Sequence, residues 1–148
     1  MSPADETILV RTMEEKDISS VIAIDKEISA HYRPDMWKSE MQHYLSKLES
    51  ICLVAEIKGH VVGFMTGAVH PWLFGVEKGG WIEILGVHPT HTGKGVGRKL
   101  GEILFEEFKA RGIKVVHTAV DWTSSDLLEF FKILGMTKSG LITLVKEL

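Results

Sequence analysis

The stretch WIEILGVHPTHTGKGVGRKL, residues 81–100, contains the pattern that decides the fold. An apolar run of the kind found in buried strands leads past Pro89 into a loop with glycines at three alternate positions, Gly93, Gly95 and Gly97. Apolar residues at helical intervals follow this loop directly. The stretch therefore predicts a strand, a glycine-rich loop and a helix, with the glycines at the mouth of the helix.

This loop has the composition of an anion-binding site. The first turn of a helix presents unpaired backbone N–H groups and a partial positive charge, so anions bind there readily. Glycines let a phosphate approach the backbone and tolerate a positive φ, and the cations Lys94, Arg98 and Lys99 add attraction. The pattern predicts a cradle for phosphate or pyrophosphate; the alternative for so short a motif is a glycine-rich turn before an ordinary helix.

Two better-known phosphate motifs do not fit the spacing of this loop. A P-loop requires Ser or Thr after its Gly-Lys pair, and no Gly-Lys pair in this chain meets that condition. A dinucleotide-binding loop requires G-x-G-x-x-G, whereas Gly95 is followed by a glycine two positions later. Spacing therefore excludes both of these motifs for this loop.

Length and composition limit the classes of protein that fit. We expect a single domain over residues 1–148, because this length suits one hydrophobic core. The net charge of −3 argues against a nucleic-acid partner, and a single cysteine, Cys52, excludes a disulfide framework within the chain. No apolar run is long enough to span a membrane, and the N-terminal residues lack the basic start of a signal peptide. We expect a soluble, cytoplasmic protein without a membrane partner.

Hydrophobic periodicity predicts alternating helices and strands along the rest of the chain. Thr12 and Glu15 have the spacing of a capping box at the start of the first helix. The turn at residues 58–60 joins two apolar runs as a hairpin. Helices interspersed with strands indicate a sheet covered by helices. The expected strands are 7–12, the two arms of the hairpin over 51–69, 81–87, 113–120 and 141–148, and the expected helices are 13–30, 35–48, 96–110 and 125–134.

The quoted stretch resembles the acyl-CoA-binding motif of the GNAT superfamily of N-acyltransferases. In that motif, written [RQ]-x-x-G-x-[GA], the loop follows a strand that ends in Val-x-Pro; residues 87–89 and 92–97 supply these two parts. A second segment, SSDLLEFFKILGM at residues 124–136, resembles the family pattern N-x-x-A-x-x-x-Y-x-x-x-G-F. Ser124 stands at its Asn position and Phe131 at its Tyr position.

The resemblance implies a fold, a cosubstrate and a site. The fold is α/β, a mixed, splayed sheet of six to seven strands flanked by helices. The cosubstrate is acetyl-CoA, with no metal, and the reaction is transfer of its acetyl group to a primary amine of a small molecule, a protein N-terminus or a lysine. The implied CoA-binding residues are Leu85, Gly86 and Val87 along the pantetheine arm, Thr92, Gly93, Lys94, Gly95, Val96, Gly97 and Arg98 around the pyrophosphate, and Ser124 and Phe131 in the second segment.

Three positions depart from the family pattern. Thr92 replaces Arg or Gln, Ser124 replaces Asn, and Phe131 replaces the tyrosine that in many members is the proposed acid for the departing thiolate. Phenylalanine cannot donate a proton, so packing is the default role of this ring. These departures leave a second function open, an acyl-CoA-binding sensor or interaction module with little or no catalysis.

Catalysis needs a base, because an amine at neutral pH is mostly an ammonium ion and must lose a proton before it attacks a thioester. Glu83 is the candidate general base, since it is an acid within an apolar strand, four residues before Val87, where several family members carry their proposed base. A solvent-facing strand glutamate is the alternative. For Asp121 a turn role, and for His117 a packing role, are the stronger interpretations.

The acceptor side of the site is less defined by the sequence. Trp72 and Phe74, in the loop before the fourth strand, are candidates for the rim of an acceptor pocket. No group of His, Cys, Asp and Glu has the spacing of a metal site. Many members of the superfamily are dimers, so the resemblance leaves a homodimer open.

Overall fold

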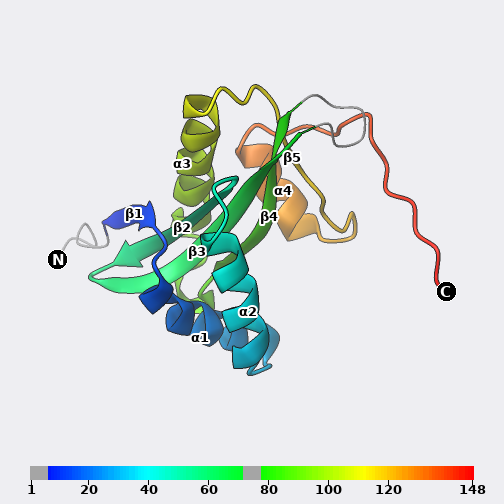
Figure 1. Ribbon diagram of the computed structural model, residues 1–148. Coiled ribbons are helices and arrows are strands. Elements are labelled where there is room, and N and C mark those ends of the chain that lie inside the picture. Colours follow the sequence, from blue (N-terminus) through cyan, green and yellow to red (C-terminus); the bar gives the residue numbers. More distant parts are fainter. Residues whose placement is uncertain (1–6, 72–77) are drawn as a thin grey trace.

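A five-stranded sheet in the order β1-β2-β3-β4-β5 forms the centre of the molecule (Figure 1). The computed structural model describes residues 7–71 and 78–148. β1 to β4 pair antiparallel with their neighbours, and β5 pairs parallel with β4. The elements are β1 (Ile8–Thr12), α1 (Ile18–Ser29), α2 (Pro34–Leu45), β2 (Ser50–Ile57), β3 (His60–His70), β4 (Gly79–Val87), α3 (Val96–Ala110), β5 (Val116–Thr118) and α4 (Ser125–Ile133).

The predicted hairpin between β2 and β3 is confirmed. Lys58 and Gly59 connect the two strands, and both have positive φ, 52° and 78°. Two successive left-handed residues form the turn whose twist matches that of the flanking strands. The long central strands β2 and β3 are almost entirely buried, and their pairing sets the register of the sheet.

Helices cover the sheet on both faces and bury two hydrophobic clusters. On one face, α3 places an apolar stripe against the sheet, and Phe131 of α4 joins the same cluster. On the other face, α1 and α2 pack against Val54 and Phe64 of the sheet. The stripe of α3 has helical spacing, as the sequence predicted: Val96, Leu100, Leu104 and Phe108. The sheet is thus the middle layer of three.

The start of α1 differs from the expected capping box. A 3₁₀ turn at Glu15–Asp17 precedes the helix, and the carboxylate of Asp17 accepts a hydrogen bond from the backbone N–H of Glu14 at 2.8 Å. Asp17 is buried and also pairs with Arg11 at 2.7 Å, and this guanidinium lowers the pKa of the carboxyl below its usual value. The cap lies two residues later than the sequence indicated, because the buried ion pair fixes Asp17 there.

Three predicted elements are shorter than expected, or absent. α2 ends at Leu45, so Leu48 is 92% exposed in the following turn instead of on the helix stripe. β5 is limited to three residues because it diverges from β4 beyond them. The expected strand at 141–148 is extended but unpaired in the described part of the chain. Over residues 7–71 and 78–148 the sheet therefore has five strands, where six to seven were expected; the α/β class with flanking helices is confirmed.

Candidate active site

Glu83 lies at an irregularity in the middle of β4. Thr66 of β3 pairs with Ile84 and the next residue of β3, Gly67, pairs with Ile82, so Glu83 is an extra residue with no opposite partner. Residues two apart in a regular strand share a face, but Ile82 and Ile84 pack into the clusters on opposite faces of the sheet. Glu83 is therefore the inserted residue of a β-bulge, and the side chains before and after it point to opposite faces of the sheet. Bulges commonly redirect side chains in this way.

Two side chains hold the carboxylate of Glu83. The phenol of Tyr44, from α2, donates to Oε2 at 2.8 Å, and Nε2 of His70, from the end of β3, lies 2.9 Å from Oε1. Burial and the neighbouring carboxylate both raise the pKa of the Tyr44 phenol, so it remains a protonated donor. Neither partner was predicted from the sequence; the polar end of Tyr44 within an apolar helix stripe was the one sign of a polar contact there.

A cavity of about 190 Å³ lies where β4 and β5 separate. Pairing between these strands ends at Ile82 and Thr118. At this last pair, the Thr118 hydroxyl donates a hydrogen bond to the Ile82 carbonyl at 3.0 Å. Beyond it, no described strand pairs with this edge of β4. The cavity wall includes Glu83 and Leu85 of β4 and Phe131 of α4, with Ile82, Thr118, Ala119, Val120 and Leu127 completing it.

The three glycines of the loop have two different structural roles. Gly93 and Gly95 have φ of +76° and +85°, and a Cβ on either would meet no atom within 4 Å. Gly95 is the N-cap of α3, so the backbone N–H groups of the first helical turn open onto this uncovered loop. Gly97 is within the helix instead, where a Cβ would approach the Phe130 ring of α4 to 2.9 Å. Two glycines therefore shape the loop, and the third allows α3 and α4 to pack closely.

The cations near the loop do not all face the mouth of the helix. Lys99 donates to the backbone carbonyl of Ile8 in β1 at 2.8 Å, and Arg98 bonds Glu102 one turn further along α3 at 2.9 Å. The expectation that Lys99 adds attraction at the loop is therefore not supported by its position. Thr92 donates its hydroxyl to the Pro89 carbonyl at 3.0 Å, which fixes the start of the loop.

Of the remaining candidates, one lines the cavity between β4 and β5. Phe131 is 6% exposed and belongs to the core, yet it also lines the cavity. Ser124 is the N-cap residue of α4 and makes no side-chain capping bond.

Asp121 accepts hydrogen bonds from the Thr123 amide and hydroxyl, the turn role expected for it. His117 stacks on Trp81 with ring centroids 4.7 Å apart. Trp72 and Phe74 are outside the described residues.

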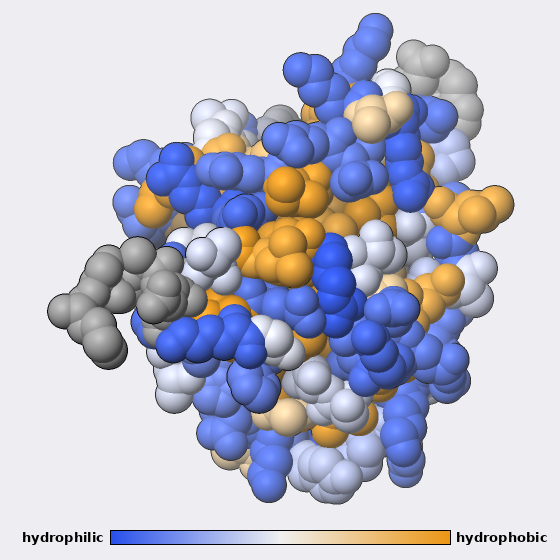
Figure 2. All heavy atoms as spheres, turned by 90° about the vertical axis from the view of Figure 1, so that its left-hand side faces the viewer, coloured by the Kyte–Doolittle hydropathy of each residue, from blue (hydrophilic) through white to orange (hydrophobic). Residues whose placement is uncertain are grey.

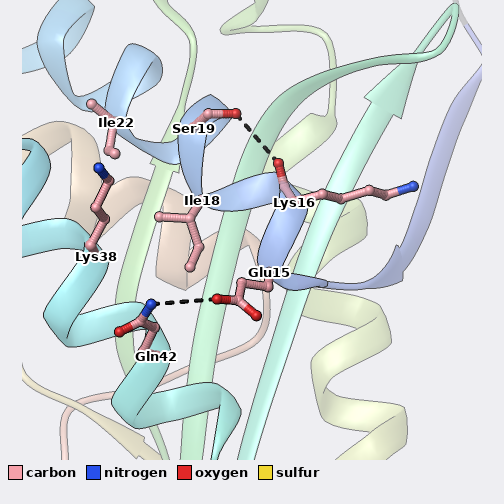
Figure 3. A pocket seen from close by; sticks show the side chains of 7 residues that line it. All are labelled: Glu15, Lys16, Ile18, Ser19, Ile22, Lys38 and Gln42. Carbon is pink, nitrogen blue, oxygen red and sulfur yellow. Dashed lines mark hydrogen bonds between the residues drawn. The ribbon is translucent and has the colours of Figure 1, made fainter.

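A second cavity, of about 240 Å³, is formed by the start of α1 and one side of α2 (Figure 3). A long hydrogen bond of 3.4 Å between Gln42 and Glu15 crosses it, and Lys16 and Lys38 are at its margin. It is larger than the cavity at β4 and β5 but shares no residue with it. The candidate base and the glycine-rich loop are both in the β4–β5–α3 region, so the smaller cavity is the one that fits the expected chemistry.

Within 7–71 and 78–148, no three His, Cys, Asp or Glu side chains group closely enough to hold a metal ion. Over the same ranges, no helix has the length and apolar character needed to cross a bilayer.

Comparison with known proteins agrees with this architecture. A model of the Acetyltransferase (GNAT) family matches residues 18–136, and the chain belongs to this family. It is 32% identical over 88 residues to a mycothiol acetyltransferase of Amycolatopsis mediterranei, a match that covers 57% of this chain and 29% of that protein. The chain thus spans less than a third of the length of this relative.

Solved structures show the same fold at low sequence identity. The aminoglycoside N-acetyltransferase AAC(6')-Iy in complex with CoA has a TM-score of 0.85 and 14% identity, with 99% of each chain covered. A transcriptional regulator from Bacillus halodurans has a TM-score of 0.82 and 20% identity, with 96% of this chain and 100% of that chain covered. At these identities the likeness concerns the fold.

Proposed function

We propose that this chain is an acetyl-CoA-dependent N-acetyltransferase that acts on a primary amine, with Glu83 as the general base. The observation that carries the proposal is that a carboxylate at a β-bulge opens into the cavity between β4 and β5. Its support comes from membership of the GNAT family and from the position of the glycine-rich loop directly after β4.

The geometry of the loop and the strand gap suits CoA. Open space above Gly93 and Gly95 gives a diphosphate access to backbone N–H groups at the start of α3. The edge of β4 at Leu85, Gly86 and Val87 has backbone groups available for the amides of the pantetheine arm. Lys94, Arg98 and Thr92 border the loop, Phe131 lines the cavity at the gap, and Ser124 is at the start of α4. Bound acetyl-CoA would supply the acyl group as an activated thioester.

Glu83 performs the proton transfer in this proposal. Its side chain is 30% exposed, so it is within reach of both an acceptor amine in the cavity and solvent. Tyr44 and His70 each engage one carboxylate oxygen and leave other lone pairs to accept the ammonium proton. The deprotonated amine then forms the new C–N bond as the C–S bond breaks. Phe131 cannot protonate the leaving thiolate, which has an ordinary thiol pKa of about 8.5 and takes its proton from water.

The acceptor is proposed only as a class. A mycothiol acetyltransferase is among the proteins related in sequence, which favours a small amine over a protein substrate. A non-catalytic acyl-CoA-binding module is the second candidate, favoured by the buried phenylalanine at the position of the family's tyrosine. Acetyl-CoA consumption distinguishes the two.

The test is a thiol-release assay with acetyl-CoA and a panel of small amines, amino-terminal peptides and lysine peptides. We expect amine-dependent release of CoA thiol for at least one small amine and a matching mass increase of one acetyl group on the acceptor. Tight binding of CoA without release on any acceptor would exclude the enzyme and leave the binding module.

Substitution of Gly95 by alanine is expected to weaken CoA binding about tenfold, because a left-handed conformation costs a non-glycine residue about 1–2 kcal/mol and the loop relieves this strain by turning its N–H groups away. Calorimetry with CoA measures the change. Gly59→Ala is the matched control, because Gly59 has φ of +78° and equally open space at the hairpin turn. Equal loss in both variants would mean that the loop does not hold the coenzyme.

A further inference from the structure

Three polar side chains from three different elements are in direct contact at the candidate base. On the face of the molecule shown in Figure 2, by contrast, hydrophilic side chains are dispersed among hydrophobic areas. The phenol of Tyr44 from α2 and the imidazole of His70 from β3 each approach a different oxygen of Glu83, at 2.8 and 2.9 Å. Contacts this short require a definite arrangement of protons, which follows from the chemistry of the three groups.

The carboxylate of Glu83 determines which nitrogen of His70 carries a proton. An ionised carboxylate has only acceptor atoms, so Nε2 of His70 carries the hydrogen of the contact with Oε1. A neutral imidazole has a single N–H, so its other nitrogen, Nδ1, is then unprotonated. The phenol of Tyr44 donates to Oε2 and remains protonated, because burial and the carboxylate raise its pKa. Two neutral donors therefore hold the carboxylate.

A second proton on the imidazole changes the nature of this contact. Histidine is the side chain whose charge ordinarily changes between about pH 5 and 8. Protonated at Nδ1 as well, His70 forms an ion pair with Glu83 through the same contact. The positive charge stabilises the carboxylate and makes it a weaker proton acceptor. The His70 and Glu83 side chains are 40% and 30% exposed, so solvent limits the change to about fivefold.

We propose that His70 is a positioning residue that acts through Glu83: as a neutral imidazole it holds the general base in place, and as an imidazolium it restrains the base and slows acetyl transfer. This inference rests on the proposed function, because it needs Glu83 to accept a proton from the amine. In that step an N–H bond of the ammonium group breaks and the proton passes to a free lone pair of Glu83. The Nε2–H bond of His70 stays intact, and the proton leaves Glu83 for solvent.

Other titratable groups lie on the elements around the end of β3. Val69 donates its backbone N–H to the carbonyl of Glu49 just before β2, and Gly79 of β4, which follows Lys78, pairs with His70. Carboxylates favour the imidazolium, and a lysine opposes it. These groups are unchanged in the variants compared below, so they do not account for a difference between variants. They are Glu40, His43 and Tyr44 on α2, Glu49 before β2, and Lys78 before β4.

The experiment compares kcat for acetyl transfer in the native chain, His70→Gln and His70→Ala between about pH 5 and 8. Glutamine has an amide N–H that can donate to Oε1 but gains no proton in this range. We expect its kcat to be close to the native value at the upper end. Toward the lower end, the ratio of its kcat to the native kcat should rise about fivefold, because only the native base becomes restrained. His70→Ala lacks the donor at every pH and should lose about tenfold in kcat at the upper end.

His60→Gln is the matched control. His60 is an exposed histidine at the first position of β3, whereas His70 is at the last. The ratio of its kcat to the native kcat is expected to be the same at every pH. Calorimetry with CoA and circular dichroism check that each variant keeps the coenzyme site and the fold, as expected for side chains that are partly or fully exposed.

The alternative outcomes separate this inference from the proposed function. A pH-independent ratio for His70→Gln, or equal losses in His70→Gln and His70→Ala at the upper end, would overturn the role of His70 and leave Glu83 as the base. ¹⁵N spectra of histidine-labelled protein report the tautomer without any turnover, and a proton on Nδ1 alone in neutral solution would also overturn it. A native chain that acetylates no amine of the panel would contradict the proposed function and this inference together.

Discussion

Replacing Glu83 with glutamine is expected to lower kcat for acetyl transfer about 10²- to 10⁴-fold at neutral pH, the usual contribution of a positioned general base. Glutamine has nearly the same shape, and its amide can still accept from the Tyr44 phenol, so the bulge and the cavity should persist. It cannot take a proton from an ammonium group. The loss should appear in kcat, while CoA affinity stays unchanged because the glycine-rich loop is intact.

The deficit of this variant should shrink as the pH rises. An alkyl amine has a pKa of about 10.4, so an increasing fraction of the acceptor is already deprotonated in alkaline solution and needs no base. The measurement is a kcat profile of both proteins from neutral to alkaline pH with the best acceptor of the panel. The matched control is Glu106→Gln, because Glu106 is an exposed carboxylate on α3. Equal kcat for Glu83→Gln and the native chain at every pH would exclude Glu83 as the base.

The sequence predicted those features of the site that depend on residues close together in the chain. The bounds of α3 agree with its apolar periodicity, and Gly93 and Gly95 adopt the positive φ that a loop at a helix mouth requires. These features depend on neighbours within a few residues. The third glycine was assigned to the same loop, but its role depends on Phe130, which is distant in sequence and approaches only when α4 packs on α3.

The setting of Glu83 could not be predicted in the same way. Its identity as an acid in an apolar strand singled it out, but its direction depends on the register shift between β3 and β4. The two partners of its carboxylate are 39 and 13 residues away in the chain. Such contacts are a product of the assembled sheet and helix layers. The same holds for the segment 141–148: its apolar pattern predicts a strand, but the described part of the chain holds no strand that pairs with it.

The hydrophobic core beneath α3 depends on a similar nonlocal fit, and Phe108→Ala is expected to lower the free energy of unfolding by about 3–5 kcal/mol, the usual cost of removing a buried aromatic ring. Phe108 is fully buried. Its ring lies against Gly67 of β3 and Gly80 of β4, where an added Cβ would come within 2.8 and 2.9 Å of it. With glycines beneath it, no side chain of the sheet at these two positions can move into the space that the ring leaves.

Urea unfolding followed by circular dichroism measures this loss, and Phe105→Ala is the matched control on the same helix. Phe105 is only partly buried at the margin of the same cluster, so its removal leaves a site that water and neighbouring side chains can fill. We expect its cost to be less than half that of Phe108→Ala, because the cavity contribution is small at an open site. Equal losses of unfolding free energy in the two variants would mean that Gly67 and Gly80 do not keep the cavity open. The sheet would then relax toward α3 when the ring is removed.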